Sequence, residues 1–267
     1  MLGFVLGVSR GALLTLDQLS DAAASAAQSL VDRRVDEGFP VAYLIGRRDF
    51  YDLSLTVDER VLIPRPETET LVETFASLDE RGRVPPGAVV DWGTGSGAVA
   101  LVTARRRPVL AIDRSWGALE LASINVAACR VPGWQAIQLA RCDGLSAVLP
   151  GTLAAVLANP PYIEAEEWAG LPADVRHEPL SALVPRGGDV ATLYSRLAAE
   201  AAVALKPGGW LLTEIGWTQG SMVAQACTRA TLSSVDVLQD LAGLDRVVVA
   251  QRPVGSPPRQ PTRPNTG

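Results

Sequence analysis

The sequence has very little lysine, histidine or cysteine. Lys206 is the only lysine and His177 the only histidine among 267 residues, so arginine carries nearly all of the positive charge. The net charge of −5 argues against broad binding to nucleic acid, which requires clustered cations to neutralise phosphates. Cys129, Cys142 and Cys227 are three in number and far apart, which fits neither a disulfide framework nor a zinc-ligand pattern. We therefore predict no metal site.

Long apolar runs are also missing. No run reaches the roughly 18 residues that a membrane-spanning helix needs, and the N-terminus has neither a cationic start nor a small-residue cleavage pattern. A hydrophobic content of 48% with 20% charged residues is typical of a globular chain that can bury a core. We expect a cytoplasmic protein that does not bind membranes and acts as a monomer.

The part of the chain before Glu67 contains two segments with different residue patterns. Apolar residues recur at helical spacing within residues 1–37, which predicts a helical segment. Residues 38–66 have a β-rich texture with interspersed turn residues, which favours a β-hairpin followed by a linker. The β-rich pieces are Val41–Leu44, Phe50–Tyr51 and Leu53–Val57. Two prolines in Pro64-Arg65-Pro66 fix φ and remove N–H donors, so this stretch is predicted to be a stiff loop.

Residues 67–252 alternate between short apolar runs and amphipathic stretches of about 10–15 residues, which predicts a largely parallel sheet covered by helices on both faces. The expected strands are Ala88–Trp92, Val109–Asp113, Ala136–Ala140, Ala154–Ala158, Trp210–Ile215, Val235–Leu238 and Arg246–Ala250. The expected helices include Gly97–Arg107, Trp116–Ala128, Asp189–Lys206 and Ser221–Thr231. The proline-rich tail 253–267 lacks apolar periodicity and is expected to be disordered.

A glycine-rich turn joins the first of these strands to the first helix. Its residues are Gly93, Thr94, Gly95, Ser96 and Gly97. Glycine permits a close approach of ligand to backbone, and the helix N-terminus offers free N–H groups to an anionic or carboxylate group. Asp91 precedes the turn, and Asp113 ends the next strand, where an acid can accept hydrogen bonds from both ribose hydroxyls of a nucleoside. We interpret this combination as a nucleoside cofactor site rather than a purely structural turn.

Charge indicates which nucleoside binds. The turn lacks the G-x-G-x-x-G spacing of dinucleotide sites, and Asp91 suits the ammonium group of S-adenosylmethionine better than a pyrophosphate. Asp143, at the end of the following strand, is a candidate for binding the adenine amino group, although it could equally cap the next turn.

Asn159, Pro160, Pro161 and Tyr162 follow directly after the apolar strand Ala154–Ala158. In an open parallel sheet the carboxyl ends of the strands form the ligand crevice. Asn159 Oδ1 and the Pro160 carbonyl could each accept a hydrogen bond from a planar NH₂ group and aim its nitrogen at an electrophilic methyl group. Tyr162 offers an aromatic face to the planar group. The loop thus suits methyl transfer to an amide or an exocyclic amine.

These motifs resemble the HemK/PrmC family of protein-(glutamine-N5) methyltransferases over nearly the whole chain. The most specific stretches are Pro40–Phe50, Val61–Glu69 (VLIPRPETE), the DWGTGSGAVAL turn, Asn159–Ile163, His177–Pro179 and Leu205–Gly216. The resemblance implies a Rossmann-like class I S-adenosylmethionine-dependent methyltransferase fold with a seven-stranded, mostly parallel sheet. It also implies that residues 1–37 are a shortened form of the family's N-terminal helical domain.

The resemblance further implies the substrate, which would be the glutamine of the Gly-Gly-Gln loop in class-I peptide chain release factors. Gly93–Gly97 and Asp113 would hold the cofactor, and Asn159 would contact both the cofactor surroundings and the substrate amide. Pro160, Pro161 and Tyr162 would complete the amide pocket, and Arg65, with its neighbour Glu67, would shape or cover it.

Three other interpretations stay open. A nucleic-acid methyltransferase acting on the amino group of adenine (N6) or guanine (N2) would use the same Asn-Pro-Pro-Tyr geometry. The acidic balance and the lack of a target-recognition domain weigh against it. A cofactor-binding protein without enzymatic activity would follow if the short N-terminus prevented docking, and the intact loop weighs against that. A dinucleotide-dependent dehydrogenase lacks its expected glycine spacing.

Overall fold

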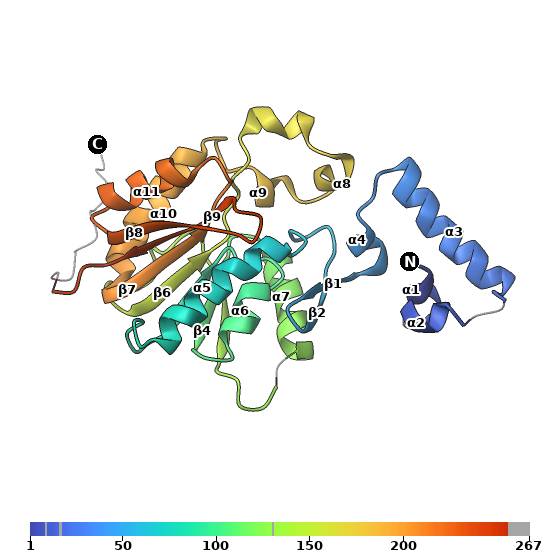
Figure 1. Ribbon diagram of the computed structural model, residues 1–267, viewed down its shortest axis with the longest axis horizontal. Helices are drawn as coiled ribbons and strands as arrows, with labels where there is room; N and C mark the ends of the chain where they lie inside the picture. The colour runs from blue at the N-terminus through green and yellow to red at the C-terminus, as the bar shows by residue number, and fades with distance from the viewer. Residues whose placement is uncertain (9, 16–17, 130, 256–267) are drawn as a thin grey trace.

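A seven-stranded, mostly parallel sheet forms the centre of the protein, as the computed structural model shows for residues 1–8, 10–15, 18–129 and 131–255 (Figure 1). Its strands are β3 (Val89–Trp92), β4 (Val109–Asp113), β5 (Ile137–Arg141), β6 (Leu153–Ala158), β7 (Leu205–Glu214), β8 (Ser233–Gln239) and β9 (Asp245–Gln251). They lie in the order β5-β4-β3-β6-β7-β9-β8, with β9 antiparallel to both of its neighbours and the other pairs parallel. The predicted α/β fold with seven strands is confirmed.

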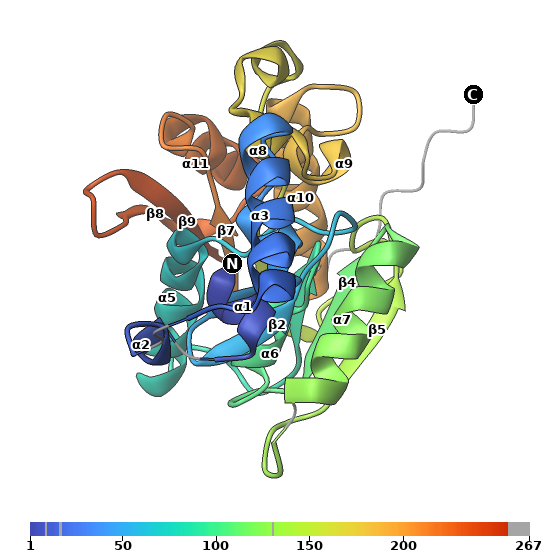
Figure 2. The ribbon, with the colours of Figure 1, turned by 90° about the vertical axis from the view of Figure 1, so that its right-hand side faces the viewer.

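Helices cover both faces of this sheet, as Figure 2 shows from a second direction. They are α5 (Glu69–Glu80), α6 (Ala98–Thr103), α7 (Trp116–Cys129), α10 (Val190–Ala204) and α11 (Gly220–Arg229). Because side chains alternate along a strand, Val90 and Val156 belong to the core beneath α10 and α11, whereas Val89 and Leu157 pack on α5 and α6. Every residue of β6 is buried, as expected for a central strand covered on both faces.

The junction between α10 and β7 differs from the predicted one. The helix was expected to continue to Lys206, but it ends at Ala204, and Leu205 and Lys206 begin β7. Pro207 explains the difference, because its ring disfavours helical geometry in the preceding residue and pushes it toward an extended conformation.

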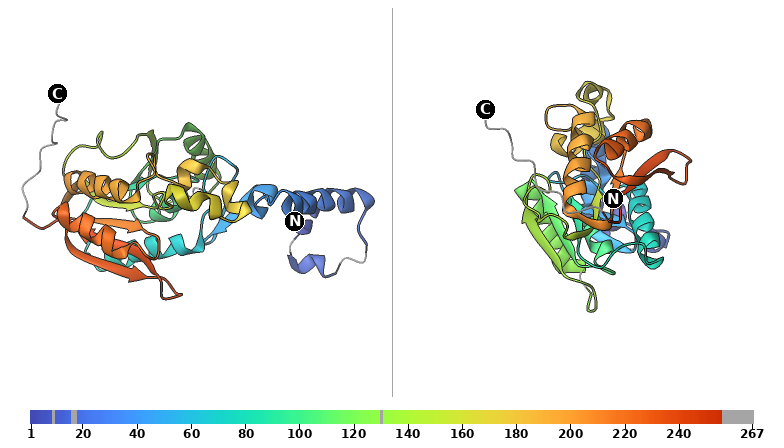
Figure 3. Two further views of the ribbon diagram at one scale, coloured as in Figure 1. Left: turned by 90° about the horizontal axis from the view of Figure 1, so that it is seen from above. Right: turned by 90° about the vertical axis from the view of Figure 1, so that its left-hand side faces the viewer.

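Within the described part of residues 1–37, three helices replace the single helical segment that the sequence predicts. They are α1 (Leu2–Leu6), α2 (Arg10–Leu13) and α3 (Asp21–Asp36). Figure 1 and the left panel of Figure 3 both show them extending away from the sheet. Gly7 ends α1 in the left-handed conformation, with a φ of 64°. No helix among the described residues combines the length and the apolar character needed to cross a bilayer.

One β-rich prediction is wrong. Val41–Leu44 lies in a short helix, α4 (Val41–Ile45), between Pro40 and the left-handed Gly46. A four-residue apolar run cannot by itself distinguish a strand from a helix, and here the two flanking residues decide. The predicted hairpin does form, from β1 (Arg47–Phe50) and β2 (Leu53–Thr56). Tyr51, expected in a β-rich piece, lies in the tight turn between them with a φ of 53°.

The connection between β6 and α10, residues 159–189, carries three short helices: η2 (Ala165–Gly170), α8 (Ala173–Arg176) and α9 (Leu180–Leu183). It contacts the N-terminal helices at two points. Arg34 pairs with Asp174 at 3.1 Å, and His177 Nε2 lies 2.8 Å from the Glu37 carbonyl oxygen. The lone histidine therefore has a structural partner. Of the predicted disordered tail, residues 256–267 lie outside the described part of the chain.

Candidate active site

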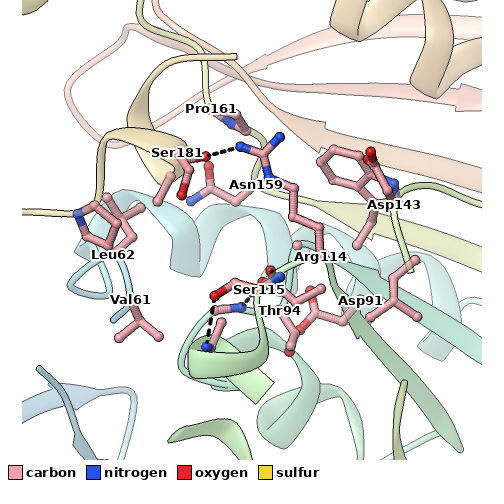
Figure 4. A pocket seen from close by; sticks show the side chains of 18 of the residues that line it. Val61, Leu62, Asp91, Thr94, Arg114, Ser115, Asp143, Asn159, Pro161 and Ser181 are labelled. Atoms are coloured by element: carbon pink, nitrogen blue, oxygen red, sulfur yellow. Dashed lines mark hydrogen bonds between the residues drawn. The ribbon is translucent and has the colours of Figure 1, made fainter. Parts of the chain in front are cut away.

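A cavity of about 280 Å³ opens at the carboxyl ends of β3, β4 and β6 (Figure 4). Its walls come from the glycine turn after β3, the residues after β4 and β5, the β6–α10 connection, the first turns of α10, and the loop before η1 (Pro66–Thr68). The predicted site residues that line it are Asp91, Gly93, Thr94, Gly95, Ser96, Asp113, Asp143, Asn159 and Pro161. Gly97, Pro160, Tyr162 and Arg65 are not part of its lining. The structure therefore brings all predicted cofactor residues except Gly97 to one cavity, but only Asn159 and Pro161 of the predicted substrate residues.

The glycine turn adopts a backbone that other residues resist. Gly93, Gly95 and Gly97 have φ values of 74°, 52° and 84°. The N–H groups of Gly93 and Thr94 both donate to the Ile112 carbonyl at 2.9 Å, which ties the turn to the end of β4. Gly97 then caps α6, so the N-terminus of that helix starts beside the cavity.

Asp91 is 2% exposed at the base of this turn. Its Oδ2 accepts hydrogen bonds from Thr94 Oγ1 at 2.6 Å and from the Ala100 N–H at 3.0 Å. Burial raises the pKa of the Asp91 carboxyl to about 7, although both hydrogen bonds oppose that rise. A cationic group in the cavity would favour the ionised carboxylate.

Asp113 has a different environment at the end of β4. Its Oδ2 accepts from the Gly95 N–H at 3.0 Å, and its Oδ1 accepts from the Ser115 N–H at 2.9 Å. Each carboxylate oxygen can accept a second hydrogen bond, so both can still receive ribose hydroxyls. The backbone holds this carboxylate in a fixed orientation at the cavity wall.

Asp143 is held by a side chain that the sequence did not point to. Arg196 donates to Asp143 Oδ1 at 2.7 Å, and this hydrogen bond lowers the pKa of the carboxyl. Arg196 also contacts Glu200 at 3.1 Å. Asp143 therefore lines the cavity as a member of a charged cluster, and its contact with adenine stays a prediction.

Asn159 presents an unpaired acceptor. Its Nδ2 donates to Thr68 Oγ1 at 3.1 Å, while its Oδ1 is buried and has no hydrogen-bond partner within the described part of the chain. Buried polar atoms without a partner are rare in folded proteins, and each one requires an explanation. An N–H donor of a ligand would supply the missing hydrogen bond.

Tyr162 lies behind the cavity rather than in its wall. Its hydroxyl lies 3.5 Å from Glu214 Oε1, and its carbonyl accepts from Gln219 Nε2 at 2.8 Å. Burial raises the pKa of the Tyr162 phenol well above its ordinary value. Gln219 fixes the backbone after the two prolines, and stacking of Tyr162 on a substrate stays a prediction.

Arg65 pairs with Glu178, whose side chain is only 1% exposed. The other oxygen of Glu178 accepts from the Ile63 N–H at 2.9 Å, so this one carboxylate holds both sides of the proline-rich loop. Burial raises the pKa of Glu178, and the Arg65 charge opposes that rise. Glu178 is within a stretch that carried the family resemblance, but nothing local indicated its partner 113 residues away.

Comparison with known proteins agrees with this geometry. Residues 66–175 match the family described as "Methyltransferase small domain". The "Release factor glutamine methyltransferase" of Xylella fastidiosa (strain Temecula1) is 42% identical over 238 residues, covering 88% of this chain and 84% of that protein. The chain belongs to the release factor glutamine methyltransferase family. The namesake protein of Escherichia coli (strain K12) is 37% identical, with 88% of this chain and 83% of that protein covered.

A solved methyltransferase from Pyrococcus furiosus shares the fold of this family member, with a TM-score of 0.53 at 14% identity. The alignment covers 87% of this chain and all of that one. The predicted family and the predicted fold class are both confirmed.

The cavity also fits S-adenosylmethionine on its own residues. Trp92 Nε1 is a buried donor without a partner among the described residues, and Trp92 lines the cavity beside the glycine turn. Asp91 provides a negative charge for an ammonium group, and Asp113 provides acceptors for ribose. One free donor and two carboxylates in the same cavity therefore match a nucleoside that carries an amino acid.

The pKa of Asp91 leads to a pH-dependent affinity. Above about pH 7 the carboxylate is ionised and attracts the ammonium group of the cofactor, whereas below this pH it becomes protonated and the attraction is lost. We expect the Kd for S-adenosylmethionine, measured by calorimetry from pH 5.5 to 8.5, to rise as the pH falls through 7. Asp91→Asn should bind more weakly and lose this dependence. An unchanged pH profile in the variant would contradict the role of Asp91.

The Arg65–Glu178 pair leads to a stability prediction. Arg65→Ala leaves a buried carboxylate without its cation and should lower the free energy of unfolding by about 2–4 kcal/mol. Arg106→Ala is the matched control, because Arg106 pairs with Glu80 at the exposed surface and its removal should cost well under about 1 kcal/mol. Urea denaturation of both variants measures the difference. Equal losses would show that Glu178 does not depend on Arg65.

Proposed function

We propose that the protein transfers the methyl group of S-adenosylmethionine to the side-chain amide nitrogen (N5) of the glutamine in the Gly-Gly-Gln motif of class-I peptide chain release factors. The observation that carries this proposal is the buried, unpartnered Asn159 Oδ1 in the wall of the cavity that the glycine turn also lines, within the described part of the chain. A primary amide supplies the N–H donor that this atom lacks. The relatives of this chain are release factor glutamine methyltransferases, which points to a release factor as the protein that carries this amide.

S-adenosylmethionine supplies an electrophilic methyl group when it is bound. The glycine turn, Asp91 and Asp113 would hold it, because these residues line the same cavity as Asn159. Asp113 would accept the ribose hydroxyls and Asp91 would face the ammonium group. The protein's contribution is then mainly to orient the two reacting groups, and such positioning can be worth on the order of 7–11 kcal/mol.

The amide nitrogen is a weak nucleophile because its lone pair is delocalised. Asn159 Oδ1 can accept one N–H of the substrate amide, whereas the second predicted acceptor, the carbonyl of Pro160, belongs to a buried residue outside the cavity lining and stays a prediction. Acceptors also favour the positive charge that develops on nitrogen during transfer. The extra proton can leave the nitrogen after transfer, so the site needs no strong general base. His177, which contacts the Glu37 carbonyl, takes no part in this step.

The substrate class, the oligomeric state and the cellular location follow from the same considerations. We infer that the substrate is a protein and not a nucleic acid, since the net charge is −5. A monomeric enzyme in the cytoplasm would meet release factors directly. Both the oligomeric state and the location stay predictions, and sedimentation of the purified chain tests the first.

An incubation with labelled S-adenosylmethionine tests the substrate. We expect label on a wild-type release factor and none on a variant whose Gly-Gly-Gln glutamine is changed to alanine, because the alanine lacks the amide. Duplex DNA added instead of the release factor should stay unlabelled. Label on DNA alone would overturn the proposal in favour of a nucleic-acid amino methyltransferase.

Removal of the Asn159 carboxamide tests the mechanism. Asn159→Ala should reduce transfer at least about 100-fold, because the substrate amide loses its orienting acceptor. The Kd for S-adenosylmethionine should change only a few-fold, since the glycine turn and both acids remain. Transfer at a near-normal rate by this variant would show that Asn159 does not orient the substrate.

A further inference from the structure

Two buried side chains that the sequence analysis did not single out lie next to Asn159. Glu214 ends β7 and is 1% exposed, and Thr68 ends η1 and is 4% exposed. Ala158 pairs with Thr213 across β6 and β7, so Asn159 and Glu214 follow neighbouring positions at the same edge of the sheet. Thr68 reaches this edge from a loop 91 residues earlier in the chain.

These side chains form a hydrogen-bonded series. Asn159 Nδ2 donates to Thr68 Oγ1 at 3.1 Å. Burial raises the pKa of the Glu214 carboxyl and the nearby Thr68 hydroxyl lowers it, while Glu214 Oε2 is buried with no hydrogen-bond partner in the described part of the chain. A hydroxyl has a single hydrogen, and a carboxylate can only accept. Glu214 Oε2 is therefore a buried acceptor that still needs a donor, and a Thr68 hydroxyl that gives its one hydrogen to this carboxylate can only accept from Asn159.

This direction matters because a carboxamide has two ends of nearly equal shape. With its oxygen and nitrogen exchanged, Asn159 would fill the same space but would present an NH₂ group in place of Oδ1. An NH₂ group cannot accept the N–H of a substrate amide. It would instead favour a ligand that offers an acceptor, such as a carboxylate. The hydrogen-bond partner of the Asn159 atom that faces Thr68 thus decides whether the atom that faces the cavity is an acceptor or a donor.

The ordinary reasons for a buried threonine at this place do not apply. Thr68 occupies the N-cap position of α5, but its side chain makes no capping hydrogen bond to that helix. Thr68 lines the cavity, whereas Glu214 does not and lies behind it. Instead, the Thr68 hydroxyl accepts from Asn159 Nδ2 and lies near the Glu214 carboxyl, whose pKa it lowers.

We propose that Thr68, oriented by Glu214, is a positioning residue that fixes the direction of the Asn159 carboxamide and thereby makes the site select a glutamine over a glutamate side chain. The proposal rests on the function proposed above and names a determinant of its specificity. Thr68 and Glu214 act through Asn159, and neither has to touch the reacting atoms.

Three variants at Thr68 test this role. Thr68→Val keeps the shape and removes the acceptor, Thr68→Ser keeps the hydroxyl, and Thr68→Cys replaces it with a weaker acceptor. Thr103→Val is the matched control, because Thr103 is a buried threonine (1% exposed) outside the cavity whose hydroxyl has no partner in the described part of the chain. Assays at pH 8.5 keep Glu214 ionised, since burial raises its pKa only to about 7.

The measurements are kcat and KM for the release factor, the Kd for S-adenosylmethionine, and inhibition by a release factor whose Gly-Gly-Gln glutamine is changed to glutamate. For Thr68→Val we expect kcat to fall on the order of 10- to 100-fold, because the Asn159 carboxamide no longer holds the substrate amide in a fixed orientation. The Kd for S-adenosylmethionine should stay within about twofold of wild type. The glutamate-containing release factor should inhibit this variant more strongly than it inhibits wild type. Thr68→Ser should restore both properties, and Thr103→Val should match wild type.

Several results would overturn the inference. They are a kcat for Thr68→Val close to that of wild type, a loss of the same size in Thr68→Ser, or unchanged inhibition by the glutamate-containing release factor. If Thr68→Val does not fold, Thr68→Cys decides: an intermediate kcat supports the role, and a wild-type kcat overturns it. Wild-type protein that labels no release factor would overturn the proposed function itself, which is a distinguishable outcome.

Discussion

The buried carboxylate of Glu178 is the constraint on which the substrate side of the cavity depends. It accepts from the Ile63 N–H and pairs with Arg65, so one side chain fixes the loop on both sides of Pro64. This loop has few donors of its own because proline removes two of them. Thr68 follows shortly after Arg65 and donates its N–H to the Arg65 carbonyl at 3.1 Å. The position of the Thr68 hydroxyl therefore depends on a carboxylate from a distant part of the chain.

A second property of the site is the burial of its acids. Asp91 and Glu214 lie at the carboxyl ends of β3 and β7, and burial raises the pKa of each to about 7. Electrostatic interactions are stronger where water is excluded, so the same burial that makes these groups costly to ionise also makes their hydrogen bonds effective. A threonine hydroxyl lowers the pKa of each acid: Thr94 in the glycine turn acts on Asp91, and Thr68 beside Asn159 acts on Glu214. The two halves of the site thus share one chemical arrangement.

The sequence predicted the sheet and the glycine turn well because both depend on local pattern. Apolar runs marked the strands, and the glycines marked the turn that their positive φ values require. It mispredicted Val41–Leu44 because four apolar residues fit either periodicity, although Pro40 and Gly46 on each side were helix-boundary signals.

The roles of Thr68 and Glu214 could not be predicted in the same way. Thr68 lies 91 residues from Asn159, and no spacing rule connects them. Arg196, which holds Asp143, was likewise hidden, because it projects from a helix that was interpreted only as a cover of the sheet. Such contacts depend on how the elements pack, and a single sequence does not specify this directly.

The β6–α10 connection has a consequence for protein engineering. Asn159 begins it, and its middle is bonded to the N-terminal helices through Asp174 and His177. A chimera that took residues 1–37 from a homologue without an arginine at position 34 would leave Asp174 without its cation, whereas His177 would still meet a backbone carbonyl at position 37. Modular exchange of the N-terminal helices thus requires residue 174 to match the incoming residue 34, even though the two lie 140 residues apart in the chain.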